Sequence, residues 1–231
     1  MGSIGSNLQE VKQRIAAACA GVGRDANTVT LLAVSKTCGA DAVRQALAAG
    51  QHAFGENYVQ EALAKIDALA DWRPQLQWHL IGPLQSNKTR PVAAAFDWVH
   101  TVDRLKIAQR LAEQRPAALP PLNICLQVNI SSEASKSGVL PHDTLALAQA
   151  VAALPRDRLV LRGLMAIPEP ASNLAAQRLP HRALRELLAA LNATGLGLDT
   201  LSMGMSADLE AAVAEGATLV RVGSAIFGLR G

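Results

Sequence analysis

The chain has 231 residues, of which 50% are hydrophobic and 3% aromatic, and its formal net charge is +3 at pH 7. This is enough apolar sequence for a complete hydrophobic core. Basic residues are scattered among acidic ones and do not gather with aromatic side chains, which argues against a nucleic-acid groove. No apolar run approaches the roughly 18 residues that a membrane span needs.

Cysteines and histidines give no sign of a disulfide framework or a metal site. The three cysteines (Cys19, Cys38 and Cys125) are odd in number and far apart, which favours a reducing compartment. The five histidines show no metal-ligand spacing. Residues 1–7 lack the basic and apolar regions of a signal peptide. We therefore expect a cytoplasmic protein that holds no metal.

The chain opens with a predicted helix, in which Leu8, Val11, Ile15 and Ala18 recur at helical spacing and which Gly21 is placed to end. Further along, short apolar runs alternate with segments of helical periodicity. The runs predict strands at residues 30–34, 52–54, 77–80, 98–101, 124–129, 160–165, 200–203 and 218–222.

This alternation predicts a single α/β barrel of the (β/α)8 TIM type. Few residues follow the last predicted strand, so the extra N-terminal helix should cover that side of the barrel. An open doubly wound sheet is the alternative, because strands as short as 52–54 carry a weak pattern. No linker or low-complexity tract divides the chain, and residues 1–231 are therefore expected to form one domain.

Lys36 stands at the end of the first predicted strand, where a run of apolar residues at 31–34 is followed by Ser35 and then by this lysine. Parallel α/β folds keep their chemistry at the carboxyl ends of strands. An amine that is partly buried there, and so shifted toward its neutral form, suits a Schiff base with an aldehyde. A lone lysine after a strand is more often a solvated loop residue, so this interpretation depends on its neighbours.

Two segments near the C-terminus have the composition of a phosphate site. Residues 202–206 (Ser-Met-Gly-Met-Ser) and 221–224 (Arg-Val-Gly-Ser) end the seventh and eighth predicted strands, after which phosphate binds in this fold. Their glycines permit close backbone approach, and their serines offer hydroxyls beside helix-starting amides. The candidate residues are Gly204, Ser206, Gly223 and Ser224.

A lysine that faces such a cradle predicts a phosphorylated aldehyde as ligand, and pyridoxal phosphate is the commonest cofactor of this kind. Arg221 could meet its pyridine nitrogen, although an arginine is more often an ion-pair partner. Ser206 could instead cap the helix that begins near Asp208. His79 is placed at the mouth of the barrel, as an acid–base group or a hydrogen-bonded histidine. Tyr58 could pack or contact the cofactor.

Several segments together resemble the pyridoxal phosphate homeostasis protein family. They are Leu-Ala-Val-Ser-Lys-Thr at 32–37, Phe-Gly-Glu-Asn-Tyr at 54–58, Trp-His-Leu-Ile-Gly-Pro-Leu-Gln-Ser-Asn-Lys at 78–88, and the runs at 202–206 and 221–228. The match extends in order from about Leu31 to Gly228. That family is similar to the barrel domain of alanine racemase but lacks its second, β-rich domain.

The resemblance implies a role for each candidate residue. Lys36 would hold pyridoxal 5'-phosphate as a Schiff base. Asn57 would lie near the ring hydroxyl of the cofactor, and Arg221 against its pyridine nitrogen. The phosphate would be held by Ser206, Gly223 and Ser224.

The expected function is intracellular homeostasis of pyridoxal phosphate by buffering or delivery, with no catalytic role. Arginine at the pyridine nitrogen weakens the ring as an electron sink. A racemase also needs a second base, which a partner domain helps to supply in the racemases that this family resembles, and we expect no such domain here. A racemase-like enzyme is the alternative, and an aldolase-like barrel a third. Apo forms of enzymes that use the cofactor are the expected partners, and we expect a monomer.

Overall fold

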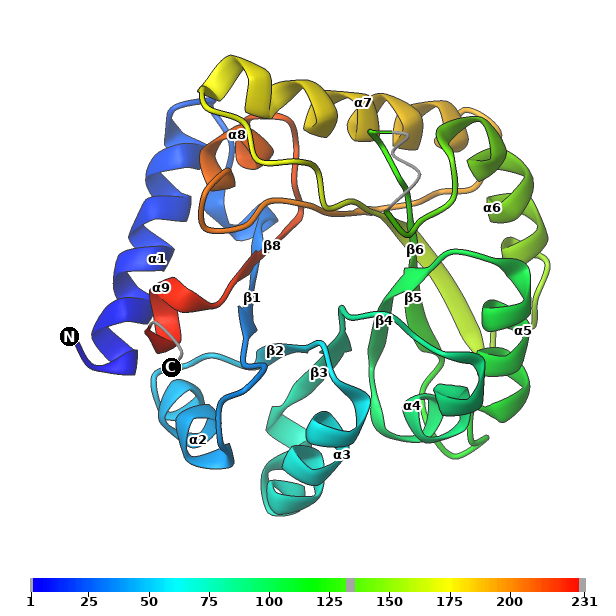
Figure 1. The fold of residues 1–231 in the computed structure, drawn as a ribbon, viewed down its shortest axis with the longest axis horizontal. Helices are drawn as coiled ribbons and strands as arrows, with labels where there is room; N and C mark the ends of the chain where they lie inside the picture. The colour runs from blue at the N-terminus through cyan, green and yellow to red at the C-terminus, as the bar shows by residue number, and fades with distance from the viewer. Residues whose placement is uncertain (1, 132–135, 229–231) are drawn as a thin grey trace.

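The computed structural model describes residues 2–131 and 136–228, whose strands close into a parallel eight-stranded barrel (Figure 1). The strands are β1 (Thr30–Val34), β2 (Ala53–Glu56), β3 (Gln77–Leu80), β4 (Trp98–Val102), β5 (Leu122–Gln127), β6 (Leu159–Met165), β7 (Thr200–Ser202) and β8 (Leu219–Val222). Each strand pairs with the next one in the chain, and β8 pairs with β1. The predicted (β/α)8 barrel is therefore confirmed.

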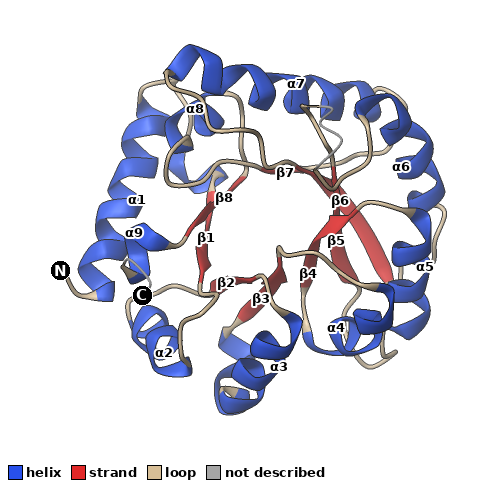
Figure 2. Ribbon diagram, viewed as in Figure 1, coloured by secondary structure: helices blue, strands red, loops and turns tan. Residues whose placement is uncertain are grey.

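Helices surround the barrel and supply the crossovers that parallel neighbours require (Figure 2). They are α1 (Ile4–Ala20), α2 (Ala40–Ala48), α3 (Val59–Ala68), α4 (Thr89–Ala95), α5 (Leu105–Gln114), α6 (Thr144–Ala152), α7 (Leu174–Asn192), α8 (Leu209–Ala214) and α9 (Ser224–Phe227). None of the helices in residues 2–131 and 136–228 combines the length and apolar character needed to cross a membrane. The assignment of residues 1–231 to one domain stays a prediction.

The helix α1 covers the side of the barrel that the chain's last turn leaves open. Among the described residues, β8 is followed by α9, a helix of four residues. The amide of Asn7 donates to the carbonyl oxygen of Ile226 at 2.9 Å, and Arg14 pairs with Glu210 on α8. Figure 1 shows α1 beside α8 and α9. The expected role of the N-terminal helix is confirmed.

Two predicted strands, 52–54 and 124–129, differ from the structure by two residues at one end or both, and the other boundaries agree to within one residue. β2 extends to Glu56, because the strand continues into the polar residues that begin the loop. β5 ends at Gln127, before the predicted end at Asn129. The N–H of Asn129 leaves the ladder and donates to the carbonyl oxygen of Val139 at 2.9 Å.

Successive side chains along each strand point alternately outward, where they pack under the helices, and inward, into the barrel. Barrel interiors are usually filled by bulky apolar side chains, and here Leu32, Val34, Ala53, Ile81 and Leu219 form such a cluster. Polar side chains from β3, β4, β7 and β8 also meet inside, where the hydrogen bond between His100 and Ser202 crosses the barrel from β4 to β7, two strands that are not neighbours. They are His79, His100, Ser202 and Arg221, all buried.

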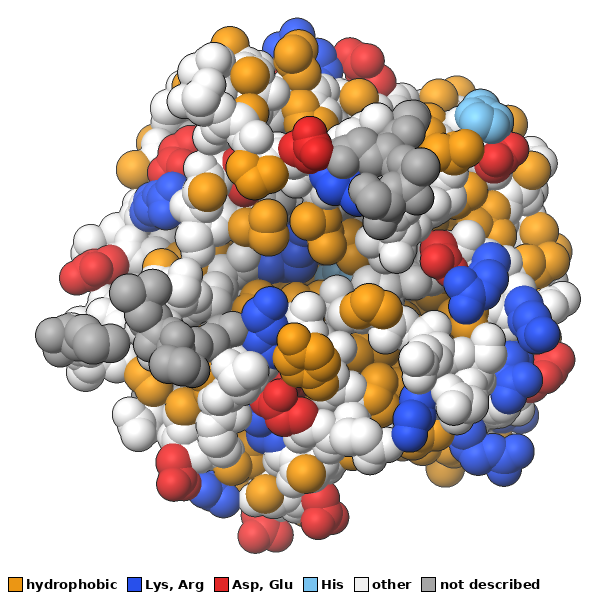
Figure 3. Space-filling view, in the orientation of Figure 1, with side chains coloured by type: hydrophobic (Ala, Val, Ile, Leu, Met, Phe, Trp, Pro, Cys, Tyr) orange, Lys and Arg blue, Asp and Glu red, His pale blue; other side chains and the backbone are white. Residues whose placement is uncertain are grey.

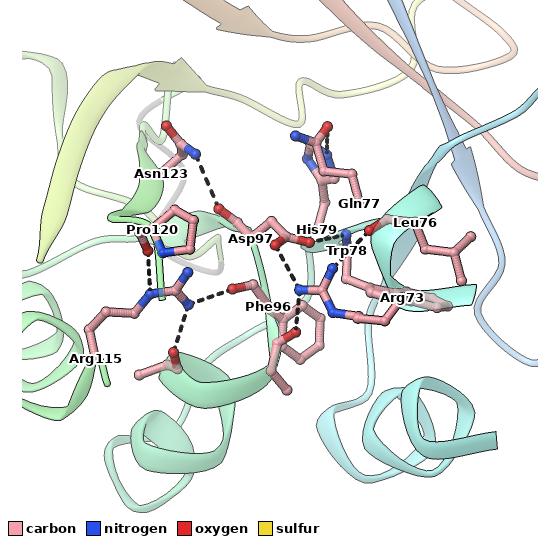
Figure 4. A network of polar contacts seen from close by, with 12 residues as sticks. Arg73, Leu76, Gln77, Trp78, His79, Phe96, Asp97, Arg115, Pro120 and Asn123 are labelled. Atoms are coloured by element: carbon pink, nitrogen blue, oxygen red, sulfur yellow. Dashed lines mark hydrogen bonds and ion pairs between the residues drawn. The ribbon is translucent and has the colours of Figure 1, made fainter. Parts of the chain in front are cut away.

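Arginines join the strand starts at the opposite end of the barrel (Figure 4). The guanidinium of Arg73 lies 2.7 Å from a carboxylate oxygen of Asp97, whose other oxygen accepts the N–H of Trp78 at 2.8 Å. Arg115 donates to the carbonyl oxygen of Phe96 at 2.7 Å. These contacts stabilise the end of the barrel that lies away from the predicted site.

Candidate functional site

A cavity of about 500 Å³ opens at the carboxyl ends of the strands. Figure 3 shows a hollow at the centre of this face, with Lys or Arg side chains inside it and at its edge. The six residues to which the family resemblance assigns cofactor contacts all line this one cavity: Lys36, Asn57, Ser206, Arg221, Gly223 and Ser224. The structure therefore brings the predicted set together, and the binding role of each residue stays a prediction.

Lys36 lies on a short backbone segment whose N–H groups on either side of the lysine are hydrogen-bonded. The N–H of Ser35 donates to the carbonyl oxygen of Gly55 at 3.0 Å, which extends the pairing of β1 with β2. Thr37 has a positive φ of 64°, which is uncommon for a residue other than glycine. Its N–H donates to a carboxylate oxygen of Glu61 at 2.5 Å. The amine of Lys36 thus projects from an anchored turn.

A buried ion pair lies under this turn. The ammonium of Lys65 is 2.6 Å from Oε1 of Glu56, and it donates to the carbonyl oxygen of Ser35 at 2.8 Å. Burial raises the pKa of Glu56, and the cation of Lys65 opposes that rise. The hydroxyl of Ser35 donates to the same carboxylate at 2.6 Å. The sequence analysis missed Lys65, although its i,i+4 spacing from Glu61 was a usable signal.

Arg221 is a buried cation with no carboxylate within ion-pair distance in the described part of the chain. Its guanidinium donates to Oγ of Ser202 at 2.8 Å and to the carbonyl oxygen of Ala166 at 2.9 Å. Burial lowers its pKa to about 10, so it stays charged at neutral pH. A buried charge without an ionic partner is costly, and such groups mark functional sites. The ion-pair interpretation of Arg221 is wrong for the described residues.

Asn57 presents an unsatisfied amide to the same cavity. Its Oδ1 is buried and has no hydrogen-bond partner among the described residues. Gly82 allows the next loop to lie against it, since a Cβ at that position would come within 2.0 Å of the Asn57 carbonyl oxygen. Buried polar groups are rarely left unpaired, so Asn57 is suited to meet a hydroxyl of a ligand.

Ser206, Gly223 and Ser224 line the cavity where α9 begins. The first amides of a helix lack partners within it, which suits them to an anion. Gly204 does not line this cavity. It has a φ of +92°, and a Cβ there would lie 2.4 Å from Cβ of Ala212. Gly204 is therefore a turn residue required by backbone shape and close packing.

The predicted place of His79 at the mouth is wrong. His79 is 1% exposed and lines a second cavity at the starts of the strands, together with Thr30 and Gln77. Its register on β3 puts it one layer below the mouth, where its ring bonds to His100 at 2.9 Å. Tyr58, in contrast, is 57% exposed and does not line the mouth cavity.

The fold and this cavity together define a barrel of the alanine racemase N-terminal domain class, and the model of that family matches residues 6–231. A pyridoxal phosphate homeostasis protein of Pseudomonas aeruginosa is 64% identical over 230 residues, which is 100% of this chain and 97% of the relative. A protein of the same name from Escherichia coli is 53% identical over 231 residues, with 100% and 98% covered. The chain therefore belongs to the pyridoxal phosphate homeostasis protein family.

Solved structures agree with this assignment. PipY of Synechococcus elongatus without pyridoxal phosphate superposes with a TM-score of 0.86 at 39% identity, over 98% of this chain and 100% of that one. The same protein with pyridoxal phosphate bound gives a TM-score of 0.80 at 41% identity, over 93% and 100%. Alanine racemase of Corynebacterium glutamicum shares the fold at 19% identity and a TM-score of 0.65, and the match covers 62% of its chain.

Proposed function

We propose that this protein binds pyridoxal 5'-phosphate and serves its homeostasis inside the cell by buffering or delivering it. One observation carries the proposal: an amine, a buried cation, an unpaired amide and an anion cradle line a single cavity. Relatives named for this function, and a homologue solved with the cofactor bound, support it.

The residues present fit the cofactor. The unpaired Oδ1 of Asn57 is suited to its ring hydroxyl, and Arg221 is suited to its pyridine nitrogen because guanidinium groups only donate. The phosphate would be held by Ser206, Gly223 and Ser224, where hydroxyls and helix-starting amides face the cavity. When bound, pyridoxal phosphate supplies an electrophilic aldehyde.

Lys36 would hold the cofactor covalently. Its Nζ would supply the amine for a C=N bond to the aldehyde carbon, with the aldehyde oxygen released as water, and hydrolysis of that bond would free the cofactor again. The anchored turn at Ser35 and Thr37 keeps the amine directed at the cavity without further ordering.

A carrier is favoured over a racemase by the chemistry of the cavity lining. Among its described residues, Lys36 and Arg221 carry the basic groups, and no histidine, tyrosine or carboxylate joins them. A racemase needs a base on each face of the substrate. Arg221 beside the pyridine nitrogen would also disfavour its protonation and weaken the ring as an electron sink.

Absorbance and mass test the covalent attachment. The wild-type protein should take up pyridoxal phosphate and show the visible band of a Schiff base, and borohydride should fix the cofactor on the peptide that contains Lys36. Lys36→Ala should lose both signals. Lys106→Ala, which removes an exposed lysine from α5, should keep them. A wild-type chain that takes up no cofactor would contradict the proposal.

Exchange of the substrate α-proton separates the carrier from an enzyme. Loaded protein is incubated with L-amino acids in deuterated water, and NMR follows loss of the α-proton signal. We expect no exchange beyond that with free pyridoxal phosphate. Exchange at turnover rates would show a racemase-like activity and overturn the non-catalytic assignment.

We further propose a monomeric cytoplasmic protein that passes the cofactor to apo forms of enzymes that use it. Cys19 and Cys125 are buried thiols outside any disulfide, which supports a reducing compartment. Light scattering after size exclusion tests the monomer. Transfer from loaded protein to an apo-enzyme, measured with and without a scavenger of free cofactor, tests whether delivery is direct.

A further inference from the structure

A continuous chain of hydrogen bonds crosses the barrel interior. It begins at Gln77, whose Oε1 lies 3.1 Å from Nε2 of His79 (Figure 4). Nδ1 of His79 lies 2.9 Å from Nε2 of His100, and Nδ1 of His100 lies 2.8 Å from Oγ of Ser202. The chain ends where the guanidinium of Arg221 donates to the same Oγ at 2.8 Å. It links the cavity at the strand starts to the cavity at the mouth.

The chemistry of the two ends sets the direction of this chain. Arg221 can only donate, so Oγ of Ser202 accepts from it and has its own hydrogen left to give to Nδ1 of His100. A ring nitrogen that accepts carries no hydrogen, so His100 must donate from Nε2 to His79. By the same reasoning His79 donates from Nε2 to the amide oxygen of Gln77. Both rings are then Nε2–H tautomers.

The opposite direction leaves a buried hydrogen unused. It requires the amide of Gln77 to be rotated, with both ring hydrogens moved to Nδ1. Ser202 would then accept from Arg221 and from His100 at once. Its own hydrogen would have no acceptor among the contacts of the described residues, although Ser202 is 0% exposed. Leaving a buried donor unpaired is unfavourable, which selects the first direction.

Burial keeps both rings neutral, as the chain requires. Burial lowers the pKa of His79 to about 3 and that of His100 well below its usual value. The ring of His79 also stacks on Trp98, with centroids 5.4 Å apart and planes inclined by 7°. A neutral imidazole has one donor and one acceptor, whereas a protonated ring has two donors and would break the chain.

We propose that His79, His100 and Ser202 are positioning residues, which hold the guanidinium of Arg221 at the cofactor cavity through a chain of one fixed direction. The part that concerns the cofactor rests on the proposed function. The direction of the hydrogen-bond chain and its contact with Arg221 do not rest on that function, because both are features of the protein without cofactor.

NMR of the unloaded wild-type chain tests the direction. Ring nitrogens labelled with 15N show which one carries hydrogen, and His79→Gln and His100→Gln serve only to assign the signals. We expect both rings to be neutral Nε2–H tautomers from pH 5 to pH 8, a range well above the pKa of His79. Nδ1–H tautomers, or a protonated ring at neutral pH, would overturn the proposal.

Substitution of Ser202 tests the hold on Arg221. Ser202→Ala removes the acceptor, so the guanidinium hydrogens of Arg221 should exchange faster with water, and pyridoxal phosphate should bind about tenfold more weakly. Ser202→Thr keeps the hydroxyl and should restore both. Thr200→Val removes a hydroxyl two residues earlier on β7, one that bonds to Asp199 and lies outside the chain, and should change neither.

The outcomes separate this proposal from the proposed function. If Ser202→Ala behaves as Thr200→Val does, the positioning role is wrong while cofactor binding stands. If the wild-type protein binds no pyridoxal phosphate, the proposed function fails. The histidine tautomers and the hydrogen exchange at Arg221 then still test whether the hydrogen-bond chain has the proposed direction and holds Arg221. If Ser202→Ala does not fold, the tautomers of His79 and His100 in the wild-type protein still test the proposed direction of the hydrogen-bond chain.

Discussion

The ammonium of Lys65 lies 2.6 Å from Oε1 of Glu56, and both side chains are buried under the turn that carries Lys36. The pair also forms two hydrogen bonds with Ser35. The ammonium of Lys65 donates to the backbone carbonyl oxygen of Ser35, and the carboxylate of Glu56 accepts a hydrogen bond from the Ser35 hydroxyl. A candidate cofactor lysine is thus supported by a second lysine that never reaches the cavity. Stability and site geometry are therefore coupled at this point of the barrel.

Breaking this pair should be costly. Lys65→Met leaves the carboxylate of Glu56 buried without its cation, and we expect a loss of about 3 kcal/mol in the free energy of unfolding at pH 7. Arg44→Met breaks an exposed pair with Asp41 and should cost at most about 1 kcal/mol. Urea unfolding measures both. Equal losses would show that the buried pair has no special role.

The same variant should depend on pH in a defined direction. Without Lys65, burial raises the pKa of Glu56 above its unfolded value, so the folded state prefers the protonated form. The penalty is then present at high pH and shrinks as the pH falls through the folded pKa. Unfolding of Lys65→Met at pH 5 and pH 8 tests this, and a penalty that grows on acidification would contradict it.

Two glycines with nearly the same positive φ isolate the effect of close packing. Gly204 and Gly195 have φ values of +92° and +90°, but only a Cβ at Gly204 meets another atom, Cβ of Ala212 at 2.4 Å. Gly195→Ala should cost about 1 kcal/mol from backbone strain alone, and Gly204→Ala about 2 kcal/mol more. The double variant Gly204→Ala with Ala212→Gly should recover the steric part. Calorimetric midpoints that are equal for the two single variants would refute this.

Glu215 should stabilise the fold at neutral pH and lose this contribution in acid. Its buried carboxylate is contacted by Arg178 at 2.7 Å, Arg185 at 2.8 Å and Arg182 at 3.1 Å. Burial tends to raise the pKa of Glu215, but the hydrogen bonds from Arg182 and Arg178 prevail and lower it. A depressed folded pKa means stability that is present above the unfolded pKa and lost as the pH falls through the folded one.

Glu215→Gln should therefore unfold more easily than the wild type at pH 7, by about 1–3 kcal/mol. The difference should narrow as the pH falls below about 4, because the unfolded wild-type chain then gains a proton that the folded carboxylate, with its lowered pKa, takes up only at still lower pH. Glu186→Gln, which alters an exposed carboxylate, should show neither effect. Urea midpoints across this range provide the measurement, and a gap that stays constant with pH would contradict the linkage.

Thiol labelling should distinguish the cysteines. Burial raises the pKa of Cys125 to about 12, and Cys19 is equally buried, whereas Cys38 is partly exposed. Iodoacetamide should add a single label to the native chain, at Cys38, and label the other two only after unfolding. Cofactor loading should slow the reaction, since Cys38 is two residues from Lys36. Peptide mass spectrometry locates the labels, and native modification of Cys125 would show that the barrel interior opens.

Local pattern was sufficient to predict the barrel and the residues at its mouth. The apolar run before Lys36 and the Gly–Ser pair at 223–224 are each signals within a few residues, and the fold rule then places strand ends together. Where the pattern is weak, at the end of β2 and at both ends of β5, the predicted boundaries were off by two residues. The likeness of those segments to a known family supplied the identity of the ligand.

Only the tertiary structure decided what lies beneath that mouth. Which inward side chains meet depends on strand register and on irregularities such as the shift between Val99 and Val102, and no local pattern encodes these. His79 was predicted at the mouth, yet one layer of register places it on a buried chain that leads to Arg221. The sequence by itself determined the ring of strand ends and the chemistry they carry; contact across the barrel, between residues over a hundred positions apart, determined what holds that chemistry in place.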